Sequence, residues 1–235
     1  MVKGIYETSR SLQAKMQKMN IVANNIANIN TPGYKSELPF SEIIYKEGKS
    51  VIKQLTDYQQ GQLLQTQNPL DVAISGKGFF SVKTDNGDIE LTRAGNFKLS
   101  DDGYLVTEDG ARVQGDRGDI NLNDFMLDQN QTVTISKKGE IKVGDNIVTN
   151  LKIVQPVDPD SLMRVDSQNF NSTEGYKPVS DSEFAVKQGY IEGSNSNPIT
   201  EMQQMIQISS EYQSAHKVMN FLDTSLGEAN AIGKV

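Results

Sequence analysis

The uneven distribution of glycine is the feature that most constrains how this 235-residue chain can fold. Gly4 is the only glycine before Thr31, and residues 194–226 contain none, whereas ten of the nineteen glycines lie between Gly76 and Gly144. Glycine destabilises the interior of a helix and is common in turns. We therefore expect helices at both ends and strands and turns between them, which is an α+β fold class.

The N-terminal residues 1–33 carry apolar side chains at the spacing of one face of a helix. Two rows repeat at intervals of seven, and the second is interrupted by Thr8 and Lys15. The apolar positions are Ile5, Leu12, Met19, Val22, Ile26 and Ile29. The pattern ends at Thr31-Pro32-Gly33, where the proline disfavours a helical conformation in the preceding residue and the glycine permits a turn. We expect one amphipathic helix of roughly 25 residues.

The C-terminal residues 197–235 have a more regular pattern, in which two apolar rows continue through four heptads. The rows consist of Met205, Ile208, Tyr212, Ala215, Met219, Leu222, Leu226 and Ala229. Such a repeat is typical of a coiled coil. Asn197 is expected to cap this helix, with Pro198 at its first position.

The charges of the two ends favour pairing between them. Residues 1–35 hold five basic side chains and one acidic side chain, whereas residues 197–235 hold two basic and four acidic ones. Opposite net charges help two amphipathic helices to choose each other, although exposed ion pairs add little energy. Residues 1–33 and 197–235 are therefore predicted to pair as one coiled-coil-like helical domain.

Signals for β-strands begin near Leu70 and continue to about residue 196. Asn-Gly and Asp-Gly pairs, such as Asn86-Gly87 and Asp109-Gly110, alternate with short runs of β-branched residues, which is a pattern of antiparallel hairpins. Residues 70–196 are therefore assigned to a central antiparallel, mainly β domain. Residues 34–69 show no clear period, and we interpret them as a connector.

The composition excludes several kinds of chemistry. The chain has no cysteine and a single histidine, so thiol catalysis, disulfide scaffolds, zinc–cysteine clusters and sites with several histidines are not available to it. His216 lies in the predicted C-terminal helix and is interpreted as a polar residue beside the apolar rows. The acidic turns around Asp101 lack the ligand spacing of a calcium loop. We expect no catalytic residue, no metal site and no cofactor.

Charge and hydropathy also limit the binding partners. A net charge of −7 disfavours a dedicated nucleic-acid-binding role, and no apolar run reaches the roughly 18–20 residues needed to span a membrane. The polar first 18 residues do not resemble a cleavable secretory signal. Long apolar rows at both ends imply burial against other copies of the chain, and a head-to-tail contact that does not close into a ring produces a filament.

Two functions of other classes remain open at this point. The basic, amphipathic N-terminal helix is compatible with a peripheral membrane binder, although it contains no Trp or Phe. A glycoside hydrolase could use a pair of carboxylates, but their spacing is three-dimensional and nothing in the sequence selects two of them.

Three motifs resemble the bacterial flagellar rod and hook proteins. They are Asn24–Lys35 (NNIANINTPGYK), Asp71–Phe80 (DVAISGKGFF) with the following Leu91–Phe97 (LTRAGNF), and Gly189–Asn195 (GYIEGSN). The resemblance implies a non-enzymatic structural subunit of the flagellar basal body, which serves motility. Its terminal helices would form a tube with copies of itself and with neighbouring rod or hook proteins. The resemblance also implies export through the flagellar type III apparatus without a cleaved signal peptide.

The resemblance further assigns structural roles to single residues. Three asparagines would satisfy backbone groups or a neighbouring subunit at the end of the first helix: Asn25, Asn28 and Asn30. The turn that follows would be set by Thr31, Pro32 and Gly33. The approach of the chain to the second helix would be fixed by Glu192, Ser194 and Asn195.

Within the family, the short length and the ending Asp223–Asn230 look closer to the proximal rod protein. A distal rod or hook subunit is the nearest alternative, although hook proteins usually carry additional outer domains. An enzyme acting on the cell wall, which a rod must cross, is the alternative from a different class.

Overall fold

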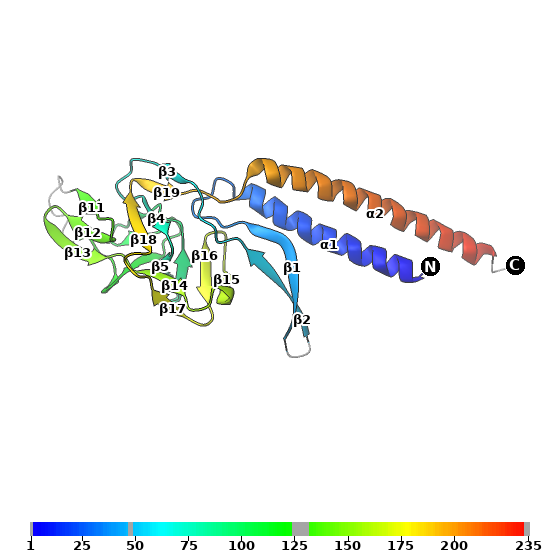
Figure 1. Ribbon diagram of the computed structural model, residues 1–235, viewed down its shortest axis with the longest axis horizontal. Coiled ribbons are helices and arrows are strands. Elements are labelled where there is room, and N and C mark those ends of the chain that lie inside the picture. The colour runs from blue at the N-terminus through cyan, green and yellow to red at the C-terminus, as the bar shows by residue number, and fades with distance from the viewer. Residues whose placement is uncertain (1, 47–48, 124–131, 233–235) are drawn as a thin grey trace. The chain divides into compact units, whose positions relative to one another are not determined.

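The computed structural model describes residues 2–46, 49–123 and 132–232 (Figure 1). The chain forms two compact units. The helical unit consists of Met1–Ile29, Ser36–Asp57 and Ser196–Val235, and the β unit consists of Asn30–Lys35 and Tyr58–Asn195. In the described ranges, no helix is both long enough and apolar enough to cross a membrane.

The helical unit is built on two long helices, α1 (Val2–Ala27) and α2 (Pro198–Ile232), which pack against each other. The predicted cap of the second helix is confirmed. The Oδ1 atom of Asn197 accepts hydrogen bonds from the backbone N–H groups of Ile199 (2.9 Å) and Thr200 (3.3 Å). These N–H groups have no partner inside the helix, so the cap stabilises its first turn.

The helical unit also contains an antiparallel hairpin of β1 (Glu37–Lys46) and β2 (Lys49–Thr56), and β1 contacts α1. This hairpin lies in the segment that the sequence indicated only as a connector. Its signal is weak because Pro39 interrupts the first strand and cannot donate a ladder hydrogen bond. The register shifts between Leu38 and Ser41, so the proline lies at an irregularity where the regular ladder is broken.

The strands of the β unit are short. They are β3 (Leu63–Gln65), β4 (Val72–Gly76), β5 (Phe79–Lys83), β6 (Ile89–Thr92), β7 (Lys98–Leu99), β8 (Leu105–Val106), β9 (Arg112–Gly115), β10 (Gly118–Asp119), β11 (Val133–Ile135), β12 (Glu140–Val143), β13 (Asn146–Asn150), β14 (Ile153–Pro156), β15 (Leu162–Arg164), β16 (Asn169–Ser172), β17 (Tyr176–Pro178), β18 (Phe184–Gln188) and β19 (Tyr190–Glu192), with a short 3-10 helix, η2 (Pro159–Ser161), before β15.

The β unit is mainly antiparallel, as its hairpin signals predict. Ten strands form the main sheet, in which β15-β16-β6-β5-β9-β8-β7 is the continuous path and β10, β14 and β17 are attached to it. A three-stranded sheet, β11-β12-β13, and the pairs β18-β4 and β19-β3 complete the unit. The predicted Asn86-Gly87 turn joins β5 to β6, and Gly87 has a φ of 89°, a conformation that other residues rarely adopt.

Two aromatic residues of β5 serve two separate cores, because successive side chains of a strand point to opposite faces. Phe80 is fully buried in the larger core, with its ring edge-on to that of Phe97 at 5.1 Å between centroids. Phe79 belongs to the smaller core, where its ring contacts Phe170 and Tyr58. Burial of each phenylalanine stabilises the fold by roughly 1.5–3 kcal/mol.

Candidate assembly site

The apolar rows predicted from the heptad pattern form the more buried side of each long helix, and we call these residues the seam. Leu12, Val22 and Ile208 are buried. Partly buried members are Ile5, Met19, Ile26, Ile29, Met205, Tyr212, Ala215, Met219, Leu222 and Leu226. Ile29 lies in the turn just after α1, and the side chain of Ala229 lies outside the described residues. The helices α1 and α2 lie side by side (Figure 1). Within one chain, the buried seam therefore belongs to the packing of α1 on α2.

The two helices run antiparallel. Lys15 forms an ion pair with Glu211, and a side chain placed on Gly4 would contact Leu222 at 3.7 Å. Residue numbers therefore rise along α1 as they fall along the facing α2. The Lys15–Glu211 pair joins the basic N-terminal end to the acidic C-terminal end, as their charges predict. The hydrogen bond from Lys15 lowers the pKa of the Glu211 carboxyl below its ordinary value.

Asn25 is buried at the end of α1 and joins three parts of the helical unit. Its Nδ2 atom donates to the backbone oxygen of Glu37 (2.8 Å) and to the carboxylate of Glu201 (3.2 Å), and its Oδ1 atom accepts from the backbone N–H of Glu37 (2.9 Å). It therefore connects α1 to the start of β1 and to the first turn of α2. Asn28 donates to the backbone oxygen of Asn24, and Asn30 is exposed.

Gly33 is required by the turn that follows α1, in which Thr31 and Pro32 are partly buried. Its φ of 69° is left-handed, and a Cβ atom on it would lie 2.2 Å from the backbone nitrogen of Ala94. Its N–H donates to the backbone oxygen of Glu192 (2.7 Å). The N-terminal motif therefore contacts the other two family motifs at this glycine.

A buried ionic cluster lies next to this contact, formed by Lys35, Arg93 and Glu192. The carboxylate of Glu192 is fully buried and accepts from Lys35 Nζ (2.6 Å), from Arg93 Nη1 (3.2 Å) and from the backbone N–H of Gly61 (3.0 Å). Lys35 also donates to the backbone oxygen of Gln59. Burial lowers the pKa of Arg93, and the Glu192 carboxylate opposes that effect. Each member comes from a different family motif.

Side chains outside the three motifs hold the same segment in place. Arg164 donates to the backbone oxygen of Lys35, and its guanidinium lies 4.9 Å from the ring centroid of Tyr34. Gln168 donates to the backbone oxygen of Pro32 (3.0 Å). Sequence reasoning did not find Arg164 or Gln168, because neither belongs to a periodic pattern or to a motif.

The connection to α2 is held at the same place. The N–H of Asn195 donates to the backbone oxygen of Tyr34 (3.4 Å), and its Nδ2 atom donates to that of Gln59 (3.2 Å). Ser194 is partly buried beside it. Residues 33–35 and 192–195 are thus paired within the β unit.

A second set of apolar side chains on α2 is exposed. Ile199, Met202 and Ile206 share one face of the helix, because they are three, four and seven residues apart. At about 100° per residue this face lies away from the seam. We call these three residues the outer stripe. Val218 and Phe221 are also exposed further along the helix. The heptad pattern did not reveal the outer stripe, because the two heptad rows describe one side of α2 and the stripe lies on another.

The single histidine takes no part in these clusters. His216 is exposed on α2, where it shares a hydrogen bond with Asn220 (3.2 Å). Its position beside the seam residues Tyr212 and Ala215 agrees with its interpretation as a polar flanking residue.

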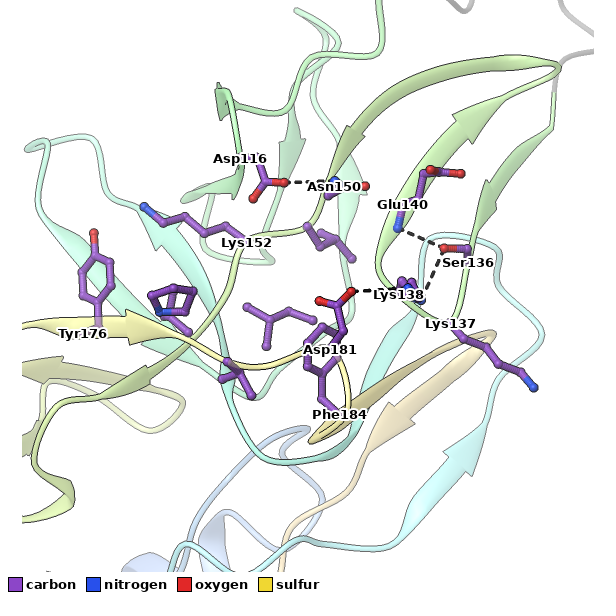
Figure 2. Close-up of a pocket in the computed structure, with 15 residues that line it drawn as sticks. Asp116, Ser136, Lys137, Lys138, Glu140, Asn150, Lys152, Tyr176, Asp181 and Phe184 are labelled. Carbon is purple, nitrogen blue, oxygen red and sulfur yellow. Dashed lines mark hydrogen bonds and ion pairs between the residues drawn. The ribbon is translucent and has the colours of Figure 1, made fainter.

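The β unit contains an open cavity of about 770 Å³, between the β11–β12 turn, β14 and the β17–β18 connection (Figure 2). Its lining includes the apolar side chains of Ile153 and Phe184. Charged groups at its rim pair with their neighbours: Lys138 with Asp181 (3.5 Å), and Asp116 with Asn150 (3.0 Å). Figure 2 shows Lys137 pointing away from the other residues. The hydroxyl of Ser136 in this lining accepts hydrogen bonds from the backbone N–H groups of Lys138 (3.3 Å) and Glu140 (3.2 Å), and so holds the β11–β12 turn.

Three family models match successive parts of the chain. They describe a flagella basal body rod protein (residues 5–35), the D1 domain of the flagellar hook protein FlgE/F/G (residues 73–143) and the C-terminal part of the flagellar basal body rod protein FlgEFG (residues 187–232). The first and third matches contain every seam residue, and each of the three matches overlaps one of the quoted motifs.

Curated relatives match over nearly the whole chain. The flagellar basal-body rod protein FlgF of Caulobacter vibrioides is 31% identical, over 93% of this chain and 93% of its own length. FlgF of Rhizobium meliloti is 29% identical over 97% of each chain. The rod protein FlgG of Agrobacterium fabrum is 28% identical over 90% of this chain and 92% of its own.

Proposed function

This chain belongs to the flagellar basal-body rod protein family and is a structural subunit of the rod, and from that premise we propose that it polymerises through its helical unit. The two helices would act as one coiled-coil-like antiparallel pair, presented to neighbouring subunits. The observation that carries the proposal is the outer stripe of α2, because it leaves apolar side chains uncovered in the single chain.

The outer stripe and the seam would have different partners. Sequence reasoning assigned the seam to contacts between subunits, but the seam residues whose burial the structure describes are already partly or fully buried in one chain. Ile199 and Ile206, by contrast, are 68% and 71% exposed. Covering each of them would contribute on the order of 1–2 kcal/mol, since full burial contributes roughly 1.5–3. We propose that the seam holds α1 on α2 and that the outer stripe binds the next copy.

Replacement of Ile206 by Asp tests this assignment. A carboxylate at an interface that excludes water is costly, whereas the same group on an exposed helix is not. We expect Ile206→Asp to abolish incorporation of the chain into purified basal bodies and to abolish swimming. Far-UV circular dichroism of the monomer should be unchanged.

Two matched variants complete the test. Ile206→Leu keeps the apolar surface and should assemble. Ser214→Asp adds the same charge at an exposed position of α2 away from the stripe and should also assemble. Normal rods from Ile206→Asp would refute the outer stripe as a subunit contact. If Ser214→Asp also fails to assemble, the defect is due to the added charge alone.

The wider setting follows from the family. We propose that the chain is located in the basal body, with copies of itself and neighbouring rod and hook proteins as partners, and that the flagellar type III apparatus exports it without cleavage. We propose the proximal part of the rod as its position, from the short length and the Asp223–Asn230 ending. Cross-linking to identified neighbours in basal bodies distinguishes this position from a distal one.

A further inference from the structure

The chain crosses between the two units four times, and three of these crossings lie next to residues that contact the ionic cluster. The four crossings lie between residues 29 and 30, 35 and 36, 57 and 58, and 195 and 196. Lys35 and Asn195 are the last residues before two of these crossings, and Gln59 is the second residue after another. Hydrogen bonds join Lys35 and Asn195 to the backbone oxygen of Gln59. The ends of three of the four connecting segments are thus held together inside the β unit.

Burial of Lys35 depends on Glu192. The ammonium group of Lys35 has no exposed surface, and its charged partner in the cluster is the carboxylate of Glu192, which lies 157 residues away in the sequence. A buried ammonium group without its counter-ion is strongly unfavourable. The contact with Glu192 therefore favours docking of residues 30–35 when residues 190–195 are in place.

The dependence also runs in the opposite direction. Glu192 is fully buried, and two of its three donors, Lys35 and Arg93, are cations. Arg93 is held independently, because it donates to the backbone oxygens of Ile74 and Gly76. Without Lys35, the carboxylate loses its shortest contact, and the Gly33 N–H bond to the Glu192 backbone is lost with the undocked segment.

We propose that Lys35, Arg93 and Glu192 form an ionic lock that makes docking of the N-terminal connection (residues 30–35) and of the C-terminal connection (residues 190–195) a single cooperative step. The chain fixes both connections or neither. One consequence rests on the proposed function: a chain assembles through α1 and α2 only after both connections have docked in its β unit. Glu192 is the positioning residue of the lock.

Amide hydrogen exchange of the full-length monomer, followed by NMR, tests the lock in Glu192→Gln. The informative amides are those of Gly33, which donates to the backbone oxygen of Glu192, and Asn195, which donates to the backbone oxygen of Tyr34. The substitution leaves both of these oxygens in place. Loss of the charge should accelerate both by the same factor, about tenfold or more, since breaking a buried pair is costly. Amides of β5 and β9 should retain their rates.

Glu183→Gln is the matched control. It removes the same charge from an exposed ion pair with Lys77 (2.8 Å) in the same unit, and it should leave the Gly33 and Asn195 amides unchanged. If Glu192→Gln does not fold, Glu192→Asp weakens the same contacts and provides the same readout.

Two results would overturn the lock. Acceleration confined to Gly61, which donates to the carboxylate itself, would show independent contacts. Equal acceleration throughout the β unit would show a contribution to global stability only. Exchange is measured on the dissociated chain, so the outcome does not depend on whether the protein assembles into a rod.

Discussion

Gly33→Ala is the substitution for which the structure gives the clearest magnitude. A non-glycine residue at a φ of 69° costs about 1–2 kcal/mol. The new Cβ atom would also lie 2.2 Å from the Ala94 nitrogen, which belongs to the backbone and cannot rotate away. Relief of such a clash by moving the chain costs about 1–3 kcal/mol more. We expect a total loss of about 2–5 kcal/mol in the free energy of unfolding of the β unit.

Gly110→Ala separates the two contributions. Gly110 has a φ of 90°, but a Cβ atom on it would meet no atom within 4 Å. The free energy of unfolding of Gly110→Ala should therefore fall only by the cost of the left-handed backbone conformation, about 1–2 kcal/mol. Urea unfolding followed by far-UV circular dichroism measures both variants. Equal losses for the two, within about 0.5 kcal/mol, would refute the close approach of Gly33 to Ala94.

Two further predictions concern the seam and an acidic site. Leu222→Asp places a carboxylate in the seam beside Gly4 and should weaken helix pairing by about 1–3 kcal/mol and block rod assembly, while the β unit keeps its thermal midpoint in calorimetry. If Leu222→Asp leaves the stability of the α1–α2 pair unchanged, the assignment of Leu222 to the seam is wrong. Burial, followed by repulsion from Asp166 and Asp88, raises the pKa of Glu90. The folded state then binds the proton more tightly, so this carboxyl reduces stability as the pH rises above its ordinary range of about 4.5. Glu90→Gln should raise the thermal midpoint at pH 7 and raise it less at pH 4, and an equal effect at both values would refute the assignment.

The sequence predicted the features that depend on local chemistry. The Asn197 cap, the Asn86-Gly87 turn and the two helices follow from rules that operate within a few residues. The seam rows were visible because burial against one partner imposes a strict period on a helix. The mainly antiparallel β region follows from turn residues spaced along the chain.

The features that the sequence did not predict depend on distant parts of the chain. The β1–β2 hairpin has an irregular register around Pro39, so its strands lack a clean alternation. The ionic cluster joins residues 35, 93 and 192, and no spacing rule relates three such positions. The motifs contained all three residues, but only the fold shows that Lys35 and Arg93 share one carboxylate.

The outer stripe shows a different limit. Ile199, Met202 and Ile206 have helical spacing, as the seam residues do, so a helix with two apolar faces offers two candidate seams. Burial in the structure distinguishes the face that packs on α1 from the face that remains exposed. The assignment of subunit contacts to the second face could therefore be made only after the fold was known.

Cysteine cross-linking in assembled rods tests the central proposal most directly, because the chain has no cysteine of its own. The Ile206→Cys variant should form bonds between subunits when purified basal bodies are treated with a short thiol cross-linker. The double variant Lys15→Cys/Glu211→Cys, which replaces the ion pair between α1 and α2, should be linked within one chain in both monomers and rods. An Ile206→Cys variant that stays unlinked in rods, or a double variant that links only between chains, would contradict the division between an intrachain seam and an outer stripe that binds the next subunit.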